Sequence, residues 1–326
     1  MNYQTPITVA QYGIGPIGAE IARLLLTKPW IKLVAAVDID PKKIGKDLGE
    51  VIGLNKQVGV KVTGDLQAKV DVVCHSTGSR LREVSTQLKA LLERGSHVVS
   101  TCEELSFPLD DRAREDLQQV ARSHNVTLLG TGVNPGFVMD KLPLTITSVC
   151  QDIKQVDIIR IQNASTRREP LQRKVGAGMT KDEFRAAVGA GKIKHMGLKE
   201  SLMMVGNGLG VDFEHVSEEK IEPVVADRKI TTQYLKVAPG QVAGVHQTIH
   251  GRGRINVNLE LRMYVGAEDV AADKVIVQGT PDIELEIKGG VHGDRATAAM
   301  VVNSIPRVVQ ARPGLLTMDD IPISFR

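Results

Sequence analysis

The sequence has few of the residues that mark several classes of protein. Only three of its 326 residues are cysteine, and Cys74, Cys102 and Cys150 form no CxxC pair, so neither a disulfide framework nor a zinc knuckle is expected. Aromatic residues make up 3% of the chain, too few to favour a platform that stacks nucleic-acid bases. No apolar run reaches about 18 residues, the length that a membrane-spanning helix needs. These absences favour a cytoplasmic protein that does not span a membrane.

Neither sign of charge is in excess. Lys and Arg number 41, Asp and Glu number 38, and the net charge of +3 gives neither a basic surface for nucleic acid nor a polybasic membrane anchor. Residues 1–6 are short and polar, and they are not followed by the apolar segment of a signal peptide. With 42% apolar residues and room for two units of roughly 150 residues, the chain is expected to fold as two domains.

Hydrophobic patterning in the first 130 residues alternates between strands and helices. Buried-strand patterns occur at 7–12, 31–37, 70–77, 97–101 and 126–130. Helical spacing of apolar residues occurs at 17–28, 81–94 and 110–124. This alternation is typical of an α/β fold with a doubly wound parallel sheet.

After about residue 150 the pattern changes. A strand is predicted at 154–165 and two helical stretches within 181–204. Residues 255–263 read I-N-V-N-L-E-L-R-M, and this strict alternation, repeated at 283–287, is typical of antiparallel strands with one wet face. The sequence therefore predicts a second, α+β domain with a mostly antiparallel sheet. The helical pattern at 294–309 is expected to pack back against the first domain.

A glycine motif follows the first predicted strand. Gly13-Ile14-Gly15-Pro16-Ile17-Gly18 matches GxGxxG and opens a predicted helix. In this context Gly13 allows a tight turn, Gly15 lets the backbone approach a pyrophosphate, and Gly18 lets the helix pack on the strand. The N-terminus of the helix, where Pro16 and Ile17 lie, supplies backbone N–H groups of its non-proline residues to the anion. The alternative, a ligand-free glycine turn, is disfavoured by this context. The motif predicts a Rossmann domain that binds NAD or NADP.

Asp38 supports this prediction. It ends the second predicted strand, 20 residues after Gly18, where a carboxylate accepts hydrogen bonds from the adenosine ribose and repels a 2′-phosphate. The position favours NAD. Lys42 and Lys43 follow closely and soften that preference, so use of both cofactors stays open, and a capping aspartate is the alternative reading.

The carboxyl ends of the predicted strands are expected to line the ligand crevice of such a sheet. Small and polar residues follow three of these ends and are expected beside the nicotinamide and its ribose: Ser76, Thr77, Gly78, Thr101 and Asn134. Ordinary turn chemistry is the alternative for each of them.

Two adjacent carboxylates, Glu103 and Glu104, follow the fourth of these strands. A carboxylate at the mouth of a cofactor crevice can hold a substrate ammonium or take a proton, whereas the alternative is a solvated pair before a helix. Which of the two faces the site is left open by the sequence. Cys102 precedes them, and a buried, inert thiol is expected there rather than a nucleophile.

In the second domain, Arg160 and Asn163 lie three residues apart. If the strand ends between them, they can converge on a substrate carboxylate, for which the planar guanidinium of arginine is well suited. His195 opens a predicted helix and is a candidate substrate ligand, with a helix cap as the alternative. His246 and His250 share a strand face without a convincing carboxylate partner, so no metal site is predicted.

These patterns place a dinucleotide-binding Rossmann domain at residues 1–135, completed by 291–326, and a substrate-binding and dimerisation domain at 136–290. The second sheet is long enough to form an intersubunit surface, which favours a homodimer.

Several motifs together resemble the 2,4-diaminopentanoate dehydrogenases and the related native amine dehydrogenases: YGIGPIG, CHSTGS, STCEELSFP, GTGVNPGFVMD, NASTRR and the closing GDRATAAMVVNSIPRVVQARPGLLTM. The resemblance spans nearly the whole chain. It implies an NAD(P)-dependent oxidative deamination, reversible as reductive amination, in which hydride leaves the amine-bearing carbon and the iminium is hydrolysed to a ketone and ammonia. It implies catalysis by Glu104 and a substrate pocket formed by Asn134, Arg160, Asn163, His195 and Thr297.

For 2,4-diaminopentanoate the implied products are 2-amino-4-oxopentanoate and ammonia. The alternatives are a broad amine dehydrogenase of simple ketones and amines, a reductase like dihydrodipicolinate reductase, or a non-catalytic NAD sensor. The reductase shares the implied fold, but its HH pair and K-x-D-x-P-S-G-T-A segment are missing here. A sensor would keep the glycine motif and have no use for Glu104.

Overall fold

The computed structural model describes residues 5–325. The chain folds into two compact units. Unit 1 comprises the residues up to Phe137 together with those from His292 onward, and unit 2 comprises Val138–Val291. Unit 1 is therefore built from both ends of the chain.

Unit 1 contains a seven-stranded sheet in the order β16-β6-β5-β4-β1-β2-β3. All of its strand pairs are parallel, which confirms the predicted doubly wound parallel sheet. The strands are β1 (Ile7–Tyr12), β2 (Ile31–Val37), β3 (Val62–Thr63), β4 (Val72–His75), β5 (His97–Ser100), β6 (Thr127–Gly130) and β16 (Gly314–Leu316).

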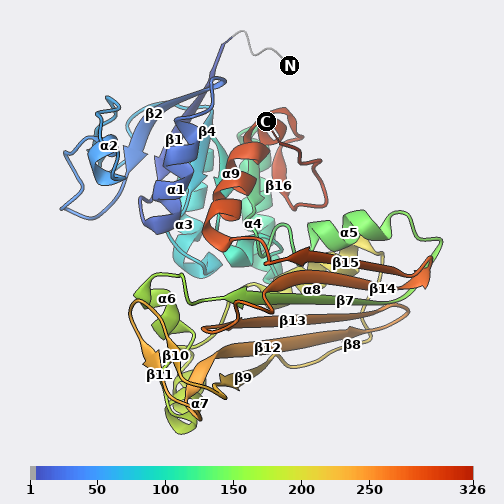
Figure 1. Ribbon diagram of the computed structural model, residues 1–326. Helices are drawn as coiled ribbons and strands as arrows, with labels where there is room; N and C mark the ends of the chain where they lie inside the picture. The colour runs from blue at the N-terminus through green and yellow to red at the C-terminus, as the bar shows by residue number, and fades with distance from the viewer. Residues whose placement is uncertain (1–4, 326) are drawn as a thin grey trace. The chain divides into compact units, whose positions relative to one another are not determined.

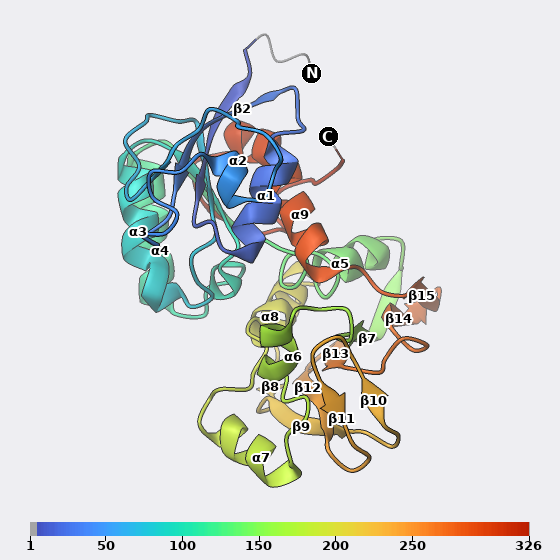
Figure 2. The same ribbon diagram turned by 60° about the vertical axis from the view of Figure 1, so that its left-hand side comes forward.

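Helices cover both faces of this sheet (Figures 1 and 2). On one face α1 (Pro16–Leu25) lies beside α9 (Gly293–Gln310), and on the other α3 (Leu81–Glu93) lies beside α4 (Asp111–Ser123). Each helix buries one apolar stripe, as Leu88 and Leu117 do against Val73 of β4, and burial of this kind provides most of the stability of such helices. Two short helices, α2 (Leu48–Val51) and the 3₁₀ helix η1 (Glu103–Leu105), lie in the connections.

Unit 2 is built on a second seven-stranded sheet in which β15, β14, β7, β13, β12 and β8 are neighbours and β9 also pairs with β12. These strands are β7 (Asp152–Asn163), β8 (His215–Val216), β9 (Lys220–Val225), β12 (Val242–Arg252), β13 (Asn256–Tyr264), β14 (Ala272–Thr280) and β15 (Ile283–Lys288). β10 (Ile230–Thr231) and β11 (Lys236–Val237) form a separate two-stranded antiparallel ribbon. The pairing is mostly antiparallel, as predicted, but β13 and β7 are parallel, so the sheet is mixed.

The alternation predicted for residues 255–263 is present in β13. Val257, Leu259 and Leu261 are buried, whereas Asn258 and Glu260 on the other face are partly exposed. The helices of unit 2 are α5 (Lys141–Thr147), α6 (Glu169–Lys174), α7 (Lys181–Gly189) and α8 (Leu198–Gly208), and α8 packs on β12 and β13. Within residues 5–325, none of the helices is both long and apolar enough to cross a membrane.

Candidate active site

The glycine turn between β1 and α1 has the geometry of an anion cradle. Gly13 has φ +87°, and a Cβ added to it would lie 2.6 Å from the carbonyl oxygen of Ser76. A Cβ on Gly18 would lie 1.9 Å from the carbonyl oxygen of Gly13, because helix and turn pack against each other there. A Cβ on Gly15 would meet no protein atom within 4 Å. The space beside Gly15 is thus open to a pyrophosphate.

The first turn of α1 points its amides at that space. Gly15 is the N-cap residue and Pro16 occupies the first turn, where the missing N–H of proline is tolerated. Ile17 and Gly18 follow at the positions whose amides have no partner inside a helix. These residues fit the pyrophosphate of a dinucleotide.

A buried glutamine that sequence reasoning missed holds the turn in place. Gln11 is fully buried, and its Nε2 donates to the carbonyl of Gly13 and to Oγ of Ser76, at 2.9 Å each. Ser76 Oγ donates to the same Gly13 carbonyl at 2.9 Å. The predicted role of Ser76 beside the cofactor is therefore accompanied by a structural one.

The carboxylate of Asp38 is engaged by protein groups. Oδ2 accepts from the backbone N–H of Ile14 and from Nζ of Lys43, both at 2.8 Å, and Oδ1 accepts from the N–H of Asp40 at 2.9 Å. Lys43 also donates to the carbonyl of Ile14 at 3.0 Å. Burial opposes ionisation of Asp38, but these bonds, with that of Lys43 foremost, hold its pKa below the usual value. Asp38 thus fixes the glycine turn through its bond to Ile14, and the ammonium group of Lys43 lies beside its carboxylate.

Polar residues follow the carboxyl ends of β4 and β5. Thr77 is exposed, and Gly78 follows it in the loop to α3. The N–H of Thr101 donates to the carbonyl of His75 at 3.0 Å, which joins the ends of the two strands.

The two predicted carboxylates lie in η1, directly after β5. Oε2 of Glu104 accepts from the N–H of Leu81, the first residue of α3, at 2.7 Å, and the N–H of Glu104 donates to the carbonyl of Ser79 at 3.3 Å. The same carbonyl accepts from Sγ of Cys102 at 3.2 Å. Burial, aided by the charges of Glu103 and Glu104, raises the pKa of Cys102 to about 12, so this thiol is no nucleophile at neutral pH.

The loop after β6 carries Asn134, which is 7% exposed. Oγ1 of Thr297, in α9, accepts from the N–H of Val133 at 3.2 Å, and so holds the loop one residue before Asn134. The predicted contribution of Thr297 therefore includes support of this loop.

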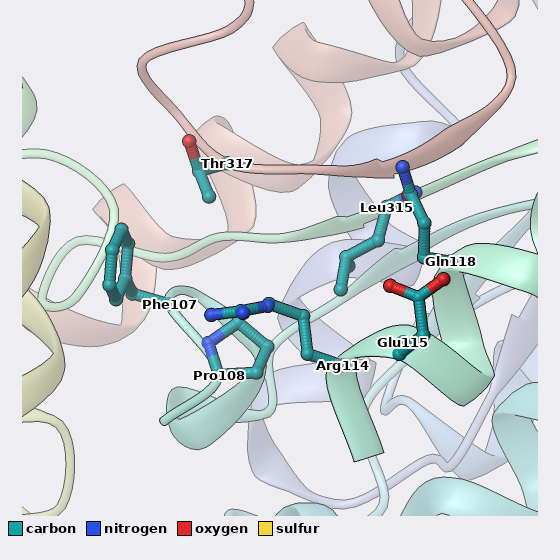
Figure 3. Close-up of a pocket in the computed structure, with 7 residues that line it drawn as sticks. All are labelled: Phe107, Pro108, Arg114, Glu115, Gln118, Leu315 and Thr317. Carbon is teal, nitrogen blue, oxygen red and sulfur yellow. The ribbon is translucent and has the colours of Figure 1, made fainter. Parts of the chain in front are cut away.

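A separate pocket of about 180 Å³ lies in unit 1 between the loop after η1, α4 and the end of β16 (Figure 3). Its lining residues are Phe107, Pro108, Arg114, Glu115, Gln118, Leu315 and Thr317. None of the residues predicted to bind the cofactor lines it. It is smaller than the ligand pockets of roughly 300–1,000 Å³ that hold drug-sized molecules.

In unit 2, the expected convergence of Arg160 and Asn163 is wrong. The strand does not end between them: β7 continues to Asn163, so positions three apart point to opposite faces. Arg160 is 3% exposed, its Nη1 lies 2.6 Å from Oδ1 of Asp273, and its Nη2 donates to the carbonyl of Val291 at 2.9 Å. Asn163 accepts from the N–H of Ser165 at 2.9 Å.

Burial dominates the electrostatics of this ion pair. It lowers the pKa of Arg160 and raises that of Asp273, while the attraction between the two partners opposes both shifts. Burial of two charges carries a large desolvation penalty. Removal of one partner strongly destabilises the folded protein, because the other charge then stays buried without a partner.

His195 lies in the segment before α8, which begins only at Leu198, so it is not the helix cap. Its N–H donates to Oε1 of Gln247 at 2.6 Å, and Nε2 of Gln247 donates back to its carbonyl at 3.2 Å. Gln247, fully buried in β12, also donates to Oε1 of Glu219 at 2.6 Å. Sequence reasoning missed Gln247, which clamps the backbone of His195.

The imidazole of His195 has a buried Nδ1. Burial lowers its pKa to about 4, the charges of Arg160 and Lys174 add to this effect, and a backbone hydrogen bond with Met196 opposes it. His195 is therefore neutral at physiological pH. Across residues 5–325 no cluster of three or more His, Cys, Asp or Glu is placed to hold a metal ion.

Residues 137–325 match the family described as 2,4-diaminopentanoate dehydrogenase C-terminal domain, and residues 7–128 match the family described as dihydrodipicolinate reductase, N-terminus. The chain is 29% identical to a 2,4-diaminopentanoate dehydrogenase of Acetoanaerobium sticklandii, over 97% of this chain and 94% of that protein. It is 25% identical to an amine dehydrogenase of Streptomyces virginiae, over 97% and 96% of the two chains.

Among solved structures, an amine dehydrogenase from Mycobacterium smegmatis superposes with a TM-score of 0.87 at 24% identity. The alignment covers 100% of this chain and 99% of that one, which shows that the two share their fold.

Proposed function

Because the chain belongs to the family of the 2,4-diaminopentanoate dehydrogenase C-terminal domain, we propose that it is an NAD(P)-dependent amine dehydrogenase that deaminates 2,4-diaminopentanoate. The observation that carries the proposal is this match, which spans the whole of unit 2. The ammonium group on C4 of the substrate first loses a proton, and C4 then loses a hydride, which leaves an iminium. Water converts this iminium to 2-amino-4-oxopentanoate and ammonia, with release of a second proton. The bound nicotinamide supplies the acceptor for the hydride.

The residues of unit 1 have the following roles in this proposal. The open space beside Gly15 and the amides of the first turn of α1 hold the pyrophosphate. Glu104, fixed by the N–H of Leu81, keeps a carboxylate oxygen with which to hold the ammonium and to take a proton from the attacking water. A carboxylate suits both tasks because it is an anion and a base.

One observation favours a second candidate, a dehydrogenase of simple amines. The charge of Arg160, which was expected to hold the substrate carboxylate, is already neutralised by Asp273. A substrate without a carboxylate requires no further cation. For a diamino acid, the cation that holds the carboxylate in place of Arg160 is Lys174, which is exposed in unit 2 and whose charge lowers the pKa of His195.

The test is reduction of NAD⁺ and NADP⁺ at alkaline pH with 2,4-diaminopentanoate, with ornithine and simple secondary amines measured in parallel. Turnover with the diamino acid alone is the expected result. Turnover with simple amines, or with ketone and ammonia in the reverse direction, selects the second candidate. Tight NADH binding without turnover of any amine refutes both.

We further propose that both NAD and NADP are used. Asp38 lies where the adenosine ribose binds and favours NAD, as its position in the sequence indicates. Lys43 lies 2.8 Å from its carboxylate and compensates the charge that would repel a 2′-phosphate. The cation thus reduces the discrimination that a lone aspartate imposes.

We also propose a cytoplasmic homodimer. Cys74, Cys102 and Cys150 are free thiols, which suits a reducing compartment. The partly exposed face of the unit 2 sheet carries Ile159 and Glu260 on directly paired strands, a mixture that a two-fold interface can bury. Light scattering tests this proposal: wild type is expected at twice the mass of one chain, Ile159→Glu at a lower mass, and a monomeric wild type refutes it.

A further inference from the structure

A buried histidine that has no part in the proposed chemistry lies at the carboxyl edge of the unit 1 sheet. His75, the last residue of β4, is fully buried. In the sheet register it pairs with Tyr12, the last residue of β1, and with Ser100, the last residue of β5. Its ring stacks on that of Tyr12, with centroids 5.8 Å apart and planes inclined by 25°. His75 thus sits in the row that faces the ligand crevice of such a sheet.

Both ring nitrogens of His75 have partners. Nδ1 lies 2.9 Å from Oγ of Ser100. Nε2 lies 3.0 Å from Oε1 of Gln87 and 2.9 Å from Oγ1 of Thr77, and Thr77 Oγ1 itself donates to Gln87 Oε1 at 2.7 Å. The carboxamide oxygen of Gln87 can only accept.

These partners select one tautomer. The proton of the neutral ring must be on Nε2, because Oε1 of Gln87 offers no hydrogen to it. Nδ1 is then an acceptor and takes the hydroxyl proton of Ser100, whose oxygen accepts from the N–H of Cys102 at 3.1 Å. Burial lowers the pKa of His75 to about 4, against the opposing bond to Gln87, so the neutral ring persists at physiological pH. The ring is a fixed link and not a proton carrier.

The two ends of this link lie in segments with different proposed tasks. Thr77 belongs to the loop after β4, next to Ser76, which donates to the glycine turn. Cys102 begins the turn that carries Glu104. We propose that His75 is a positioning residue that holds the cofactor loop with its Nε2 side and the Glu104 turn with its Nδ1 side. The inference rests on the proposed function, which gives these two segments their roles.

Two variants each keep one half of the link. His75→Asn places an amide oxygen where Nδ1 was, so it can still accept from Ser100 but cannot reach Gln87 and Thr77. His75→Gln places an amide N–H where Nε2 was, so it keeps the second half and loses the acceptor for Ser100. The affinity for NADH is measured by titration with its fluorescence as the signal, and kcat is measured with 2,4-diaminopentanoate at saturating cofactor.

We expect His75→Asn to weaken NADH binding roughly tenfold with little change in kcat, the loss that one or two hydrogen bonds would cause. We expect His75→Gln to lower kcat by a similar factor, about tenfold, with little change in NADH affinity. Gln87→Leu and Ser100→Ala leave the ring in place and each remove one of its partners. They are expected to repeat the two phenotypes respectively, which covers the case in which a His75 variant does not fold.

Equal losses of affinity and kcat in both His75 variants, or a change in thermal stability alone, would overturn the proposal. A histidine that only supports the fold would not affect NADH affinity and kcat separately. If the wild type binds NADH but oxidises no amine, the proposed function fails. NADH binding then decides the inference by itself, and unchanged affinity in both His75→Asn and Gln87→Leu overturns it.

Discussion

Oε2 of Glu104 accepts a 2.7 Å hydrogen bond from the backbone N–H of Leu81, the first residue of α3. The side chain that the family resemblance places in catalysis is therefore also bound to the N-terminus of a helix. The bond fixes the position of the carboxylate at the start of α3.

Replacement of Glu104 by glutamine separates these two roles. Glutamine keeps an oxygen that can accept from Leu81, so Glu104→Gln is expected to fold with unchanged NADH affinity. Its kcat is expected to fall by roughly 10²–10⁴-fold, the usual contribution of a general acid or base. Glu103→Gln, in the same short helix, is the matched control and is expected to retain kcat. Loss of activity in the Glu103 variant alone would move the catalytic role to that residue.

The glycine turn allows a comparison of two identical substitutions. Gly15→Ala places a methyl group in open space, so the protein is expected to keep its Tm and to lose NADH affinity. Gly18→Ala places a Cβ 1.9 Å from a backbone oxygen, so it is expected to lower the Tm. Thermal unfolding and NADH titration check both variants. A Gly15→Ala variant with wild-type affinity would show that the pyrophosphate lies elsewhere.

Lys43 is expected to govern the choice of cofactor. Lys43→Met removes the cation beside Asp38 and is expected to weaken NADPH binding more than NADH binding, because only NADPH brings a 2′-phosphate near the carboxylate. Titration of both reduced cofactors checks this ratio, and Lys42→Met is the control at the neighbouring position. An equal effect on both cofactors would show that Lys43 only supports the turn.

The buried pair of Arg160 and Asp273 is expected to respond strongly to single substitutions. Arg160→Met leaves a buried carboxylate without its partner and is expected to cost about 3–5 kcal/mol of stability. The double variant Arg160→Met/Asp273→Leu is expected to recover much of this loss. Denaturation experiments on both variants check the expectation.

The double variant also tests substrate recognition. If it folds and its KM for 2,4-diaminopentanoate rises while that for simple amines does not, Arg160 holds the carboxylate despite its pairing. An unchanged KM would limit Arg160 to a structural role.

Two buried histidines predict how stability depends on pH. Burial lowers the pKa values of His75 and His195 from 6.5 to about 4. The folded state therefore takes up protons less readily than the unfolded state. The contribution of the two neutral histidines to the free energy of unfolding is complete above pH 6.5 and is lost as the pH falls towards 4. The Tm is expected to decline over this window.

Substitutions show whether the histidines cause the decline. His195→Gln is expected to make it shallower, whereas substitution of the exposed His124 by glutamine is not. A wild-type Tm that is constant from pH 6.5 to 4 would contradict the assigned burial.

The sequence was sufficient where structure depends on neighbouring residues. Gly13, Gly15 and Gly18 have the predicted geometries because a strand, a turn and a helix within a few residues determine them. Asp38 was located correctly at the end of β2, but its bonds to Ile14 and Lys43 could not be foreseen from spacing.

Sequence reasoning was insufficient where the register between strands decides. Nothing local distinguishes His75 from any other histidine in a strand, since its partners come from β1, β5 and α3. The convergence of Arg160 and Asn163 required the strand to end between them, whereas β7 continues through both residues and so turns them to opposite faces. The three-residue β16 was not predicted, because it is a strand only by virtue of pairing with β6.

The route of the chain also sets the order in which the two units can be completed during synthesis. Unit 2 lies wholly within residues 138–291, so all of it is synthesised before α9 and β16. Until then the nascent parallel sheet ends at β6, an edge strand with unpaired backbone groups that can pair with other chains. Unit 2 can thus fold first, whereas the sheet of unit 1 is complete only after β16 has been made.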